Sequence, residues 1–240
     1  MNIFSRIRNR FLTFFGDIKV FKYPFFLLYD PGSYKVKGSE VRKTIDLIEP
    51  GDILIRGYSN YLDGAFIPGF FSHAGLFLGE TKKSDVQISP GYESFFYEGK
   101  QVAIHAMAKG VFTEDIISFC KCDYLVILRR NKRIEPDVDL TTDFISIYAK
   151  ALQNIGKPYD FKFDFSDYGN LSCTEMVYAC NEHFLPLYNV RLKKRSVMLI
   201  KKEMLVPDDF ITQEFDIVFS SQSVKQSKLE AIMDFNRTSA

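Results

Sequence analysis

Four short apolar segments follow one another along the chain without a helical pattern between them, and this order restricts the possible folds most. They span residues 53–55, 71–79, 102–106 and 124–128. Short apolar segments separated by turn formers and polar connections are typical of β-strands. Consecutive strands commonly pair antiparallel, whereas parallel strands need a long crossover that is usually a helix. The sequence therefore predicts an α+β fold built around an antiparallel sheet.

A helix is predicted after these strands, over residues 144–155. Apolar residues recur there at helical spacing, and Gly156 marks the end of the pattern. Thr141 or Thr142 can cap the start of this helix, because a hydroxyl can accept a hydrogen bond from the free N–H groups of the first turn.

A second helix is predicted to begin at Cys173. Ser172 and Glu175 form the S-x-x-E pattern of a capping box, in which the two side chains bind backbone N–H groups at the helix start. A late strand is predicted over residues 215–219. Residues 220–240 are mostly polar, and we expect them to form a loose tail.

The composition excludes several classes of protein. A chain of 240 residues is long enough for one domain or at most two. With 31 Lys and Arg against 30 Asp and Glu, the net charge of +1 argues against a domain that mainly binds nucleic acid. Four cysteines are too few for a disulfide scaffold. No segment reaches the roughly 18 to 20 apolar residues that a membrane-spanning helix needs.

The N-terminal segment, residues 1–22, combines apolar residues at helical spacing with three Arg and two Lys against one Asp. One hypothesis is a helix that lies on an anionic membrane surface, where the basic stretch at residues 191–202 could join it. The other, which we favour, is a terminal helix packed against its own domain, with the basic stretch as a solvated face. Because no continuous apolar core of a signal peptide is present, we expect a cytoplasmic protein, either free or peripheral on the inner face of the membrane.

Cys173 is the most informative residue for chemistry. At the start of a helix, the helix dipole and free N–H groups favour the thiolate, and the same N–H groups can form part of an oxyanion hole. The commoner role of a free cysteine is that of a small buried apolar residue. Position alone leaves both roles open.

A nucleophilic cysteine needs a base, which is usually histidine, and the chain has three histidines. His183 lies ten residues beyond Cys173 on the predicted helix, roughly 15 Å along its axis, which is too far. His73 and His105 lie on two predicted strands. Because neighbouring strands are about 4.8 Å apart, the two rings can touch, one as the base and the other as its orienting partner.

Metal binding has weak support in the sequence. His73, His105 and Cys173 lack the short spacings, such as H-x-x-x-H or C-x-x-C, that mark zinc ligands. The three aspartates within residues 160–167 lack the central Gly and terminal Glu of a calcium-binding loop. The two cysteines of residues 120–122 are expected to be structural. We therefore expect no metal and no cofactor.

Two segments of the chain resemble a known family. Residues 72–79, Ser-His-Ala-Gly-Leu-Phe-Leu-Gly, downstream of residues 50–54, resemble the histidine strand of the NlpC-type papain-like cysteine hydrolases. Residues 156–160, Gly-Lys-Pro-Tyr-Asp, followed by residues 171–177, resemble their cysteine segment. In common members the cysteine precedes the histidine. The reversed order here resembles the circularly permuted branch, the YiiX-like hydrolases, which is related to the lecithin:retinol acyltransferase-like proteins. The similarity covers about residues 48–180.

The resemblance implies a permuted papain-like fold, in which an antiparallel sheet packs on the helix that carries the nucleophile. It implies Cys173 as nucleophile and His73 as base. The third catalytic residue lies on the next strand, where a YiiX-like protein is expected to have Glu in a segment like Ile-Glu-Ala; this chain has His105 there. Tyr159 matches a tyrosine of the family near the cysteine, which implies a part in binding the oxyanion. Its alternative role is that of a core aromatic residue.

These expectations combine into a functional hypothesis. We expect a thiol hydrolase that cleaves an amide bond, in a peptide or a peptidoglycan stem peptide, through a Cys-His-His triad and an acyl-enzyme. A lipid acyl hydrolase or acyltransferase with the same triad, and a non-catalytic binding module, are the alternatives. We expect the hydrolase domain to span residues 46–220, with an N-terminal arm at 1–45 and a polar tail at 221–240. The expected partners are a small peptide, peptidoglycan or lipid substrate, with no nucleic acid.

Overall fold

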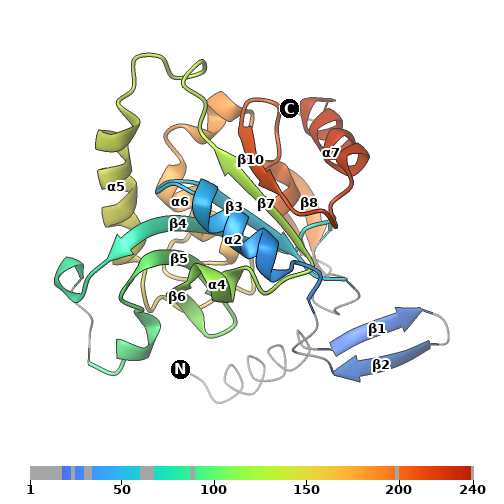
Figure 1. Ribbon diagram of the computed structural model, residues 1–240, viewed down its shortest axis with the longest axis horizontal. Coiled ribbons are helices and arrows are strands. Elements are labelled where there is room, and N and C mark those ends of the chain that lie inside the picture. Colours follow the sequence, from blue (N-terminus) through green and yellow to red (C-terminus); the bar gives the residue numbers. More distant parts are fainter. Residues whose placement is uncertain are drawn as a thin grey trace.

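The computed structural model describes residues 18–22, 25–29, 34–59, 68–86, 90–197 and 200–238, and at residues 18–22, 25–29, 196–197 and 200–201 it describes the backbone alone. Within these residues, six strands form one antiparallel sheet in the order β10-β7-β3-β4-β5-β6 (Figure 1). The strands are β3 (Ile53–Gly57), β4 (His73–Thr81), β5 (Gly99–Met107), β6 (Gly110–Asp115), β7 (Tyr124–Arg129) and β10 (Asp216–Ser220). The α+β fold with an antiparallel sheet is confirmed, and the five predicted strands correspond to β3, β4, β5, β7 and β10. β6 was not predicted.

Helices cover both faces of this sheet (Figure 1). They are α2 (Gly38–Leu47), α4 (Ile116–Phe119), α5 (Leu140–Gln153), α6 (Cys173–Asn181) and α7 (Gln226–Thr238). α6 packs against β4 and β5 on one face, with α5 beside it, and α2 and α4 lie on the other face. Short 3-10 helices lie at Lys83–Asp85, Glu93–Phe95, Leu185–Tyr188 and Pro207–Phe210.

The two faces of the sheet have separate apolar clusters. Because side chains alternate along a strand, Leu76 and Ile104 join the cluster that contains α6, whereas Phe77 and Ala103 join the cluster that contains α4. β3 lies inside the sheet, and all of its residues are buried. This two-sided burial explains why the strand begins with a continuous apolar run, residues 53–55, rather than an alternating pattern.

α5 begins at a different cap from the one predicted. The carboxylate of Asp139 accepts a hydrogen bond from the N–H of Thr141 (3.1 Å) and another from Oγ1 of Thr142 (2.6 Å). The prediction that Thr141 or Thr142 is the cap is therefore wrong, because both threonines already lie in the first turn. The predicted end is close to the observed one, since the helix stops at Gln153 and Gly156 has a positive φ of 83°.

In the part of the chain that the structure describes, two further strand pairs lie outside the main sheet. One consists of β1 (Ile18–Lys22) and β2 (Phe25–Tyr29), and the other of β8 (Lys193–Val197) and β9 (Ile200–Met204). The helix predicted over residues 1–22 is therefore wrong at residues 18–22, where β-branched residues alternate with others and favour a strand. Residues 1–17 of that prediction lie outside the described residues. The membrane contact expected through residues 1–22 stays a prediction.

The C-terminal segment is ordered rather than loose. α7 buries Leu229 and Ile232 in the main core, and the amide of Asn236 donates hydrogen bonds to the carbonyls of Asp208 (2.8 Å) and Ile211 (2.9 Å). The prediction of a loose tail is wrong because Leu229, Ile232 and Asn236 lie on one face of a helix, among exposed polar residues. The division of the chain at residues 45 and 220 stays a prediction.

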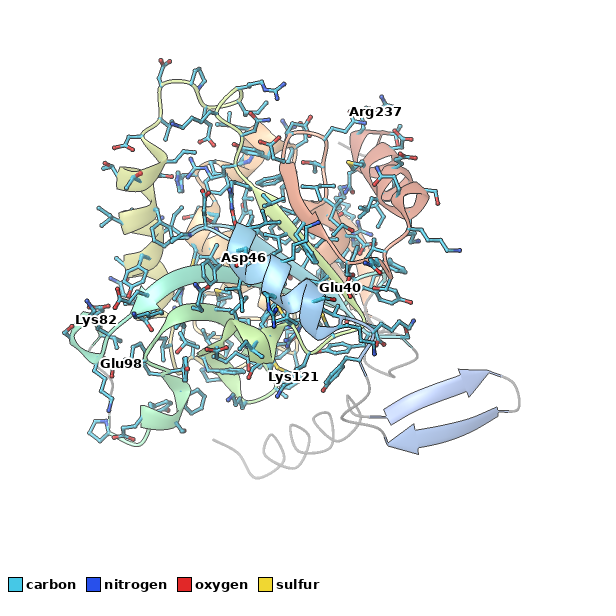
Figure 2. All side chains as sticks on the ribbon, viewed as in Figure 1. Glu40, Asp46, Lys82, Glu98, Lys121 and Arg237 are labelled. Carbon is cyan, nitrogen blue, oxygen red and sulfur yellow. The ribbon has the colours of Figure 1, made fainter. Side chains whose placement is uncertain are left out.

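α2 is fixed to the rest of the chain by a buried carboxylate. Glu40 lies near the start of this helix and Asp46 near its end (Figure 2). Glu40 accepts hydrogen bonds from the backbone N–H of Lys37 (3.0 Å) and, far away in the sequence, of Gln222 (2.8 Å). This contact joins α2 to the segment that follows β10. Within the described residues, no helix has the length and apolarity that crossing a membrane requires.

Candidate active site

The start of α6 has the geometry that the capping-box pattern predicts. The N–H of Ser172 donates to Oε2 of Glu175 (2.7 Å), and the N–H of Glu175 donates to Oγ of Ser172 (3.4 Å). The prediction that this helix begins at Cys173 is confirmed. Cys173 is therefore held in the first turn, at the positive end of the helix dipole. Its side chain is only 2% exposed.

Backbone N–H groups surround the sulfur of Cys173. Those of Ala74, on β4, and of Thr174 lie close enough to Sγ to lower the pKa of the thiol. Burial raises the pKa of the Cys173 thiol to about 11, although these two N–H groups and the charge of Arg56 oppose the increase. The thiol therefore keeps its proton at neutral pH, and a nearby base must remove it before the sulfur can attack.

The sheet brings the two strand histidines into contact. Gly75 of β4 lies opposite His105 of β5, which places His73, two residues earlier, on the same face of the sheet. Nε2 of His73 lies 2.8 Å from Nδ1 of His105, and the ring planes cross at 88°. His73 therefore uses Nε2 for this contact, and Nδ1 is the nitrogen that remains for a proton transfer.

Both histidines are neutral at neutral pH. Burial lowers the pKa of His73 well below its ordinary value, and the nearby charge of Arg56 lowers it further. Burial also lowers the pKa of His105, to about 4. Each ring therefore has one N–H group, so in their hydrogen bond one ring donates and the other accepts.

Two charged residues beside His105 were not found by the sequence analysis. Oε1 of Glu114, on β6, lies 3.0 Å from Nε2 of His105, off the axis of the ring N–H, and 3.6 Å from Nη1 of Arg56. Arg56 is buried; it donates to the carbonyl of Phe119 (2.8 Å) and lies 4.2 Å from the centre of that ring. For Glu114, the available signal in the sequence was the segment after Gly110. This strand is too short to be recognised from its residue pattern.

The start of β4 lies beside the sulfur of Cys173. The N–H that reaches Sγ belongs to Ala74, the residue that directly follows His73. Among the residues that the structure describes, no hydrogen bond joins the His73 ring to Cys173 itself. The structure thus brings His73 and His105 into direct contact and places the thiol at the adjacent backbone position.

Tyr159 lies on a segment that runs along the free edge of β6. Val111 donates to the carbonyl of Lys157 (2.9 Å) and accepts from the N–H of Gly156 (2.9 Å). Gly110 makes this approach possible, because a Cβ there would overlap the Lys157 carbonyl oxygen and its φ is +118°. The Tyr159 ring packs 4.7 Å from that of Phe161 and lines a cavity of about 250 Å³.

The family of this chain follows from its match to a family model. The model of the permuted papain-like amidase enzymes, YaeF/YiiX, C92 family, matches residues 47–233. The chain belongs to this family. It is a cysteine peptidase or amidase-like hydrolase with a permuted papain-like fold, in which the histidine strand precedes the cysteine helix. The family resemblance drawn from the sequence is confirmed.

A solved structure supports the permuted papain-like fold of this chain. The crystal structure of the metalloprotein yiiX from Escherichia coli O157:H7 superimposes with a TM-score of 0.52 at 15% sequence identity. The match covers 73% of this chain and 98% of that chain. No curated protein sequence matches the chain. Within the described residues, no group of three or more His, Cys, Asp or Glu side chains is placed to hold a metal ion.

Other charged side chains form contacts of their own. His183 lies beyond the end of α6, where its Nε2 is 3.0 Å from Asp143 on α5. Asp160 accepts hydrogen bonds from two backbone N–H groups of its own loop. In the basic stretch, Arg195 pairs with the buried Asp209, and Lys202 pairs with Asp164 at 3.0 Å, so part of its charge is neutralised.

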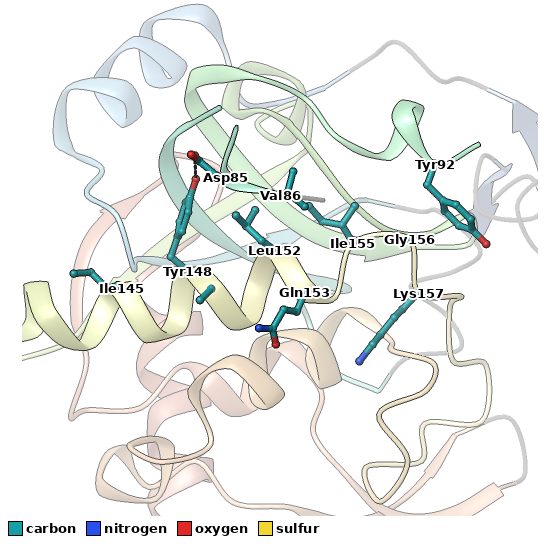
Figure 3. Close-up of a pocket in the computed structure, with 11 residues that line it drawn as sticks. Asp85, Val86, Tyr92, Ile145, Tyr148, Leu152, Gln153, Ile155, Gly156 and Lys157 are labelled. Carbon is teal, nitrogen blue, oxygen red and sulfur yellow. Dashed lines mark hydrogen bonds between the residues drawn. The ribbon is translucent and has the colours of Figure 1, made fainter. Parts of the chain in front are cut away.

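A larger cavity of about 650 Å³ lies between α5 and the connection from β4 to β5 (Figure 3). The hydroxyl of Tyr148 donates to Asp85 at its rim (2.7 Å), and apolar side chains including Leu152 and Ile155 line it. It reaches Lys157, two residues before Tyr159, but Cys173, His73 and His105 do not line it. The volume of this cavity alone therefore does not identify it as the active site.

Proposed function

We propose that this hydrolase cleaves an amide bond with Cys173 as nucleophile, His73 as base and His105 as the orienting residue. The observation that carries the proposal is the 2.8 Å contact between Nε2 of His73 and Nδ1 of His105, next to the backbone N–H of Ala74, which lowers the pKa of the Cys173 thiol. This arrangement combines a buried thiol at a helix start, a neutral imidazole and a partner for its other nitrogen, which together are the parts of a nucleophilic cysteine site.

Acylation begins with a proton transfer. Nδ1 of His73 accepts the thiol proton, and the sulfur of Cys173 attacks the carbonyl carbon of the amide, whose oxygen becomes an oxyanion. The tetrahedral intermediate then breaks the C–N bond, and the proton on Nδ1 goes to the leaving nitrogen. The products of this half-reaction are a free amine and a thioester on Cys173.

Hydrolysis of the thioester regenerates the enzyme. Nδ1 of His73 accepts a proton from water, and the resulting hydroxide attacks the thioester carbonyl. The C–S bond breaks, and the proton returns to the sulfur of Cys173. The sum of the two halves is an amide plus water giving a carboxylic acid plus an amine. His105 stays neutral throughout and holds the His73 ring in place.

The oxyanion needs hydrogen-bond donors beside the sulfur. The backbone N–H of Cys173 is the first donor, because it lies in the first turn of α6 where N–H groups have no helical partner. We propose the hydroxyl of Tyr159 as the second donor. Tyr159 follows the segment that β6 holds through Val111, so its position relative to the sheet is fixed by backbone hydrogen bonds.

The substrate class that we propose is a peptide or a peptidoglycan stem peptide. Membership of an amidase family supports an amide, and the neutral resting pair of thiol and imidazole provides the proton that a poor nitrogen leaving group needs. A lipid ester uses the same steps, so the choice between amide and ester must be made by measurement.

The test measures turnover of matched substrates. Purified protein is incubated with peptide amides, peptidoglycan stem peptides and phospholipid or acyl esters, and the intact mass of the protein is recorded during turnover. We expect amide cleavage and an acyl adduct on Cys173, both lost in Cys173→Ala. Cys180→Ala, which removes another buried thiol from the same helix, is the matched control and should retain activity once folding is verified. Turnover by Cys173→Ala would exclude the thiol mechanism, and turnover of esters alone would replace the amide with a lipid substrate.

A further inference from the structure

Glu114 contacts the side of His105 that faces away from His73. Its Oε1 lies 3.0 Å from Nε2 of His105, whereas Nδ1 of the same ring faces His73. The pairing of β5 with β6 sets this geometry, because Ala103 lies opposite Glu114 and His105 opposite Phe112, so Glu114 and His105 are diagonal neighbours on one face. The three side chains form a continuous row from Glu114 through His105 to His73.

Glu114 is ionised in this row. Burial alone raises the pKa of its carboxyl group, but His105 and the charges of Arg56 and Lys109 outweigh burial and hold the pKa below its ordinary value. Arg56, from β3, lies 3.6 Å away from the same oxygen that faces His105. Lys109, in the turn between β5 and β6, lies 3.3 Å from the centre of the Phe112 ring, which itself packs on His105.

The carboxylate determines which nitrogen of His105 holds the proton. A negative oxygen 3.0 Å from Nε2 attracts an N–H and repels a bare lone pair, so the neutral ring places its hydrogen on Nε2. Nδ1 of His105 is then an acceptor. Across the 2.8 Å contact, Nε2 of His73 must donate, which leaves Nδ1 of His73 without a hydrogen. In the proposed reaction, Nδ1 of His73 is the nitrogen that accepts the thiol proton.

We propose that Glu114 is a positioning residue that acts through His105 to hold His73 in the tautomer whose Nδ1 can accept the proton of Cys173. This inference rests on the function proposed above for Cys173 and His73. Without the carboxylate, His105 can place its hydrogen on Nδ1 instead. His73 would then accept at Nε2 and hold its own hydrogen on Nδ1, where it blocks the transfer from the thiol.

The test reads the tautomers directly by ¹⁵N NMR of histidine-labelled protein. The chain has three histidines, so the imidazole spectrum contains three rings, assigned with His105→Gln and His183→Gln variants. We expect the Nε2–H tautomer for both His73 and His105 in the unsubstituted protein at pH 7. An Nδ1–H signal for His105 would overturn the assignment without any variant, which keeps the test valid if substitutions impair folding.

Substitutions at Glu114 test the cause. Glu114→Ala should give a mixture of tautomers at His73 and His105 while His183, which pairs with Asp143, does not change. Glu114→Gln should give tautomer populations between those of the unsubstituted protein and Glu114→Ala, because its amide can present either an acceptor or a donor to Nε2. Asp115→Asn is the matched control: it removes a negative charge from the next residue of β6, on the opposite face, and keeps a good cap for α4. It should leave both tautomers as they are. Unchanged tautomers in Glu114→Ala would contradict the proposal.

Activity of the same variants separates this inference from the proposed function. We expect kcat/KM to fall on the order of 10²-fold in Glu114→Ala and not in Asp115→Asn. If Glu114→Ala changes the tautomers but Cys173→Ala remains active, the proposed function fails and the tautomer assignment stands. If Cys173→Ala is inactive but Glu114→Ala keeps the native tautomers and the native rate, the inference fails and the proposed function stands.

Discussion

Nε2 of His73 lies 2.8 Å from Nδ1 of His105, across two strands that pair antiparallel. This contact depends on Gly75, which lies two residues after His73 on β4 and opposite His105 on β5. A Cβ at Gly75 would come within 2.8 Å of the Phe119 ring and 3.1 Å of the Ile104 carbonyl oxygen. The glycine therefore gives the Phe119 ring the space to pack beneath both histidines.

Gly75→Ala should accordingly destabilise the fold and disturb the histidine pair. Because the methyl group overlaps a ring and a backbone oxygen rather than a flexible side-chain end, we expect a loss of about 1 to 3 kcal/mol in the free energy of unfolding. Urea unfolding followed by circular dichroism measures it. Gly38→Ala, at the start of α2 with open space around the glycine, is the control and should be neutral or stabilising. Equal stability of the two variants would show that the space at Gly75 is not required.

Substitutions at His105 should separate orientation from proton transfer. In His105→Gln and His105→Glu, the side-chain oxygen can still accept the Nε2–H of His73, so we expect each variant to retain a substantial part of kcat/KM. His105→Ala has no acceptor and should lose on the order of 10²-fold. If His105→Gln is inactive while His73→Ala stays active, the two roles are reversed.

The stability of the protein should depend on pH through His105. Its pKa is about 4 in the fold, below the ordinary value of 6.5, so between these values the unfolded chain binds a proton that the folded chain does not. The free energy of unfolding should therefore decrease as the pH falls from 6.5 to 4. With about 1.4 kcal/mol per pKa unit, the contribution of this one group is up to about 3 kcal/mol.

His105→Gln should remove this contribution and flatten the decrease, although His73, whose pKa is shifted in the same direction, keeps its own share. The measurement is urea unfolding of both proteins at several pH values across this range. Parallel curves for the two proteins would contradict a neutral, buried His105.

The cap of α6 gives a prediction about the nucleophile's position. Ser172→Ala removes the hydroxyl that accepts the N–H of Glu175, and we expect a loss of about 1 kcal/mol in the free energy of unfolding. Ser227→Ala, in the exposed first turn of α7, should cause no loss, because alanine favours helix. A loss of the same size in both variants would show that the serine at position 172 is not a cap.

Local sequence signals were sufficient for much of the fold and for the start of α6. The apolar runs of β3 and β7 and the capping box of Ser172 and Glu175 are readable without knowing the tertiary structure, because the residues that define them are neighbours in sequence. The pairing of His73 with His105 was accessible for a related reason, since consecutive strands commonly lie side by side.

Other features depend on tertiary structure. Glu114 gains its place beside His105 from the register of β5 and β6, which no local pattern specifies. β6 is only six residues long and directly precedes α4, so its alternation is brief. In α7, Leu229 and Ile232 are apolar residues that pack against the core. Most residues around them are polar, so the composition of this segment does not indicate a packed helix.

The most direct test of the account is the alkylation rate of each cysteine by iodoacetamide, mapped by mass spectrometry. We expect Cys173 to react faster than Cys120, Cys122 and Cys180, because backbone N–H groups stabilise its thiolate and His73 removes its proton. In His73→Ala, the rate at Cys173 should fall toward that of the other three while their rates stay the same. Equal rates at all four cysteines in the unsubstituted protein, or a Cys173 rate unaffected by His73→Ala, would contradict a nucleophile that depends on His73.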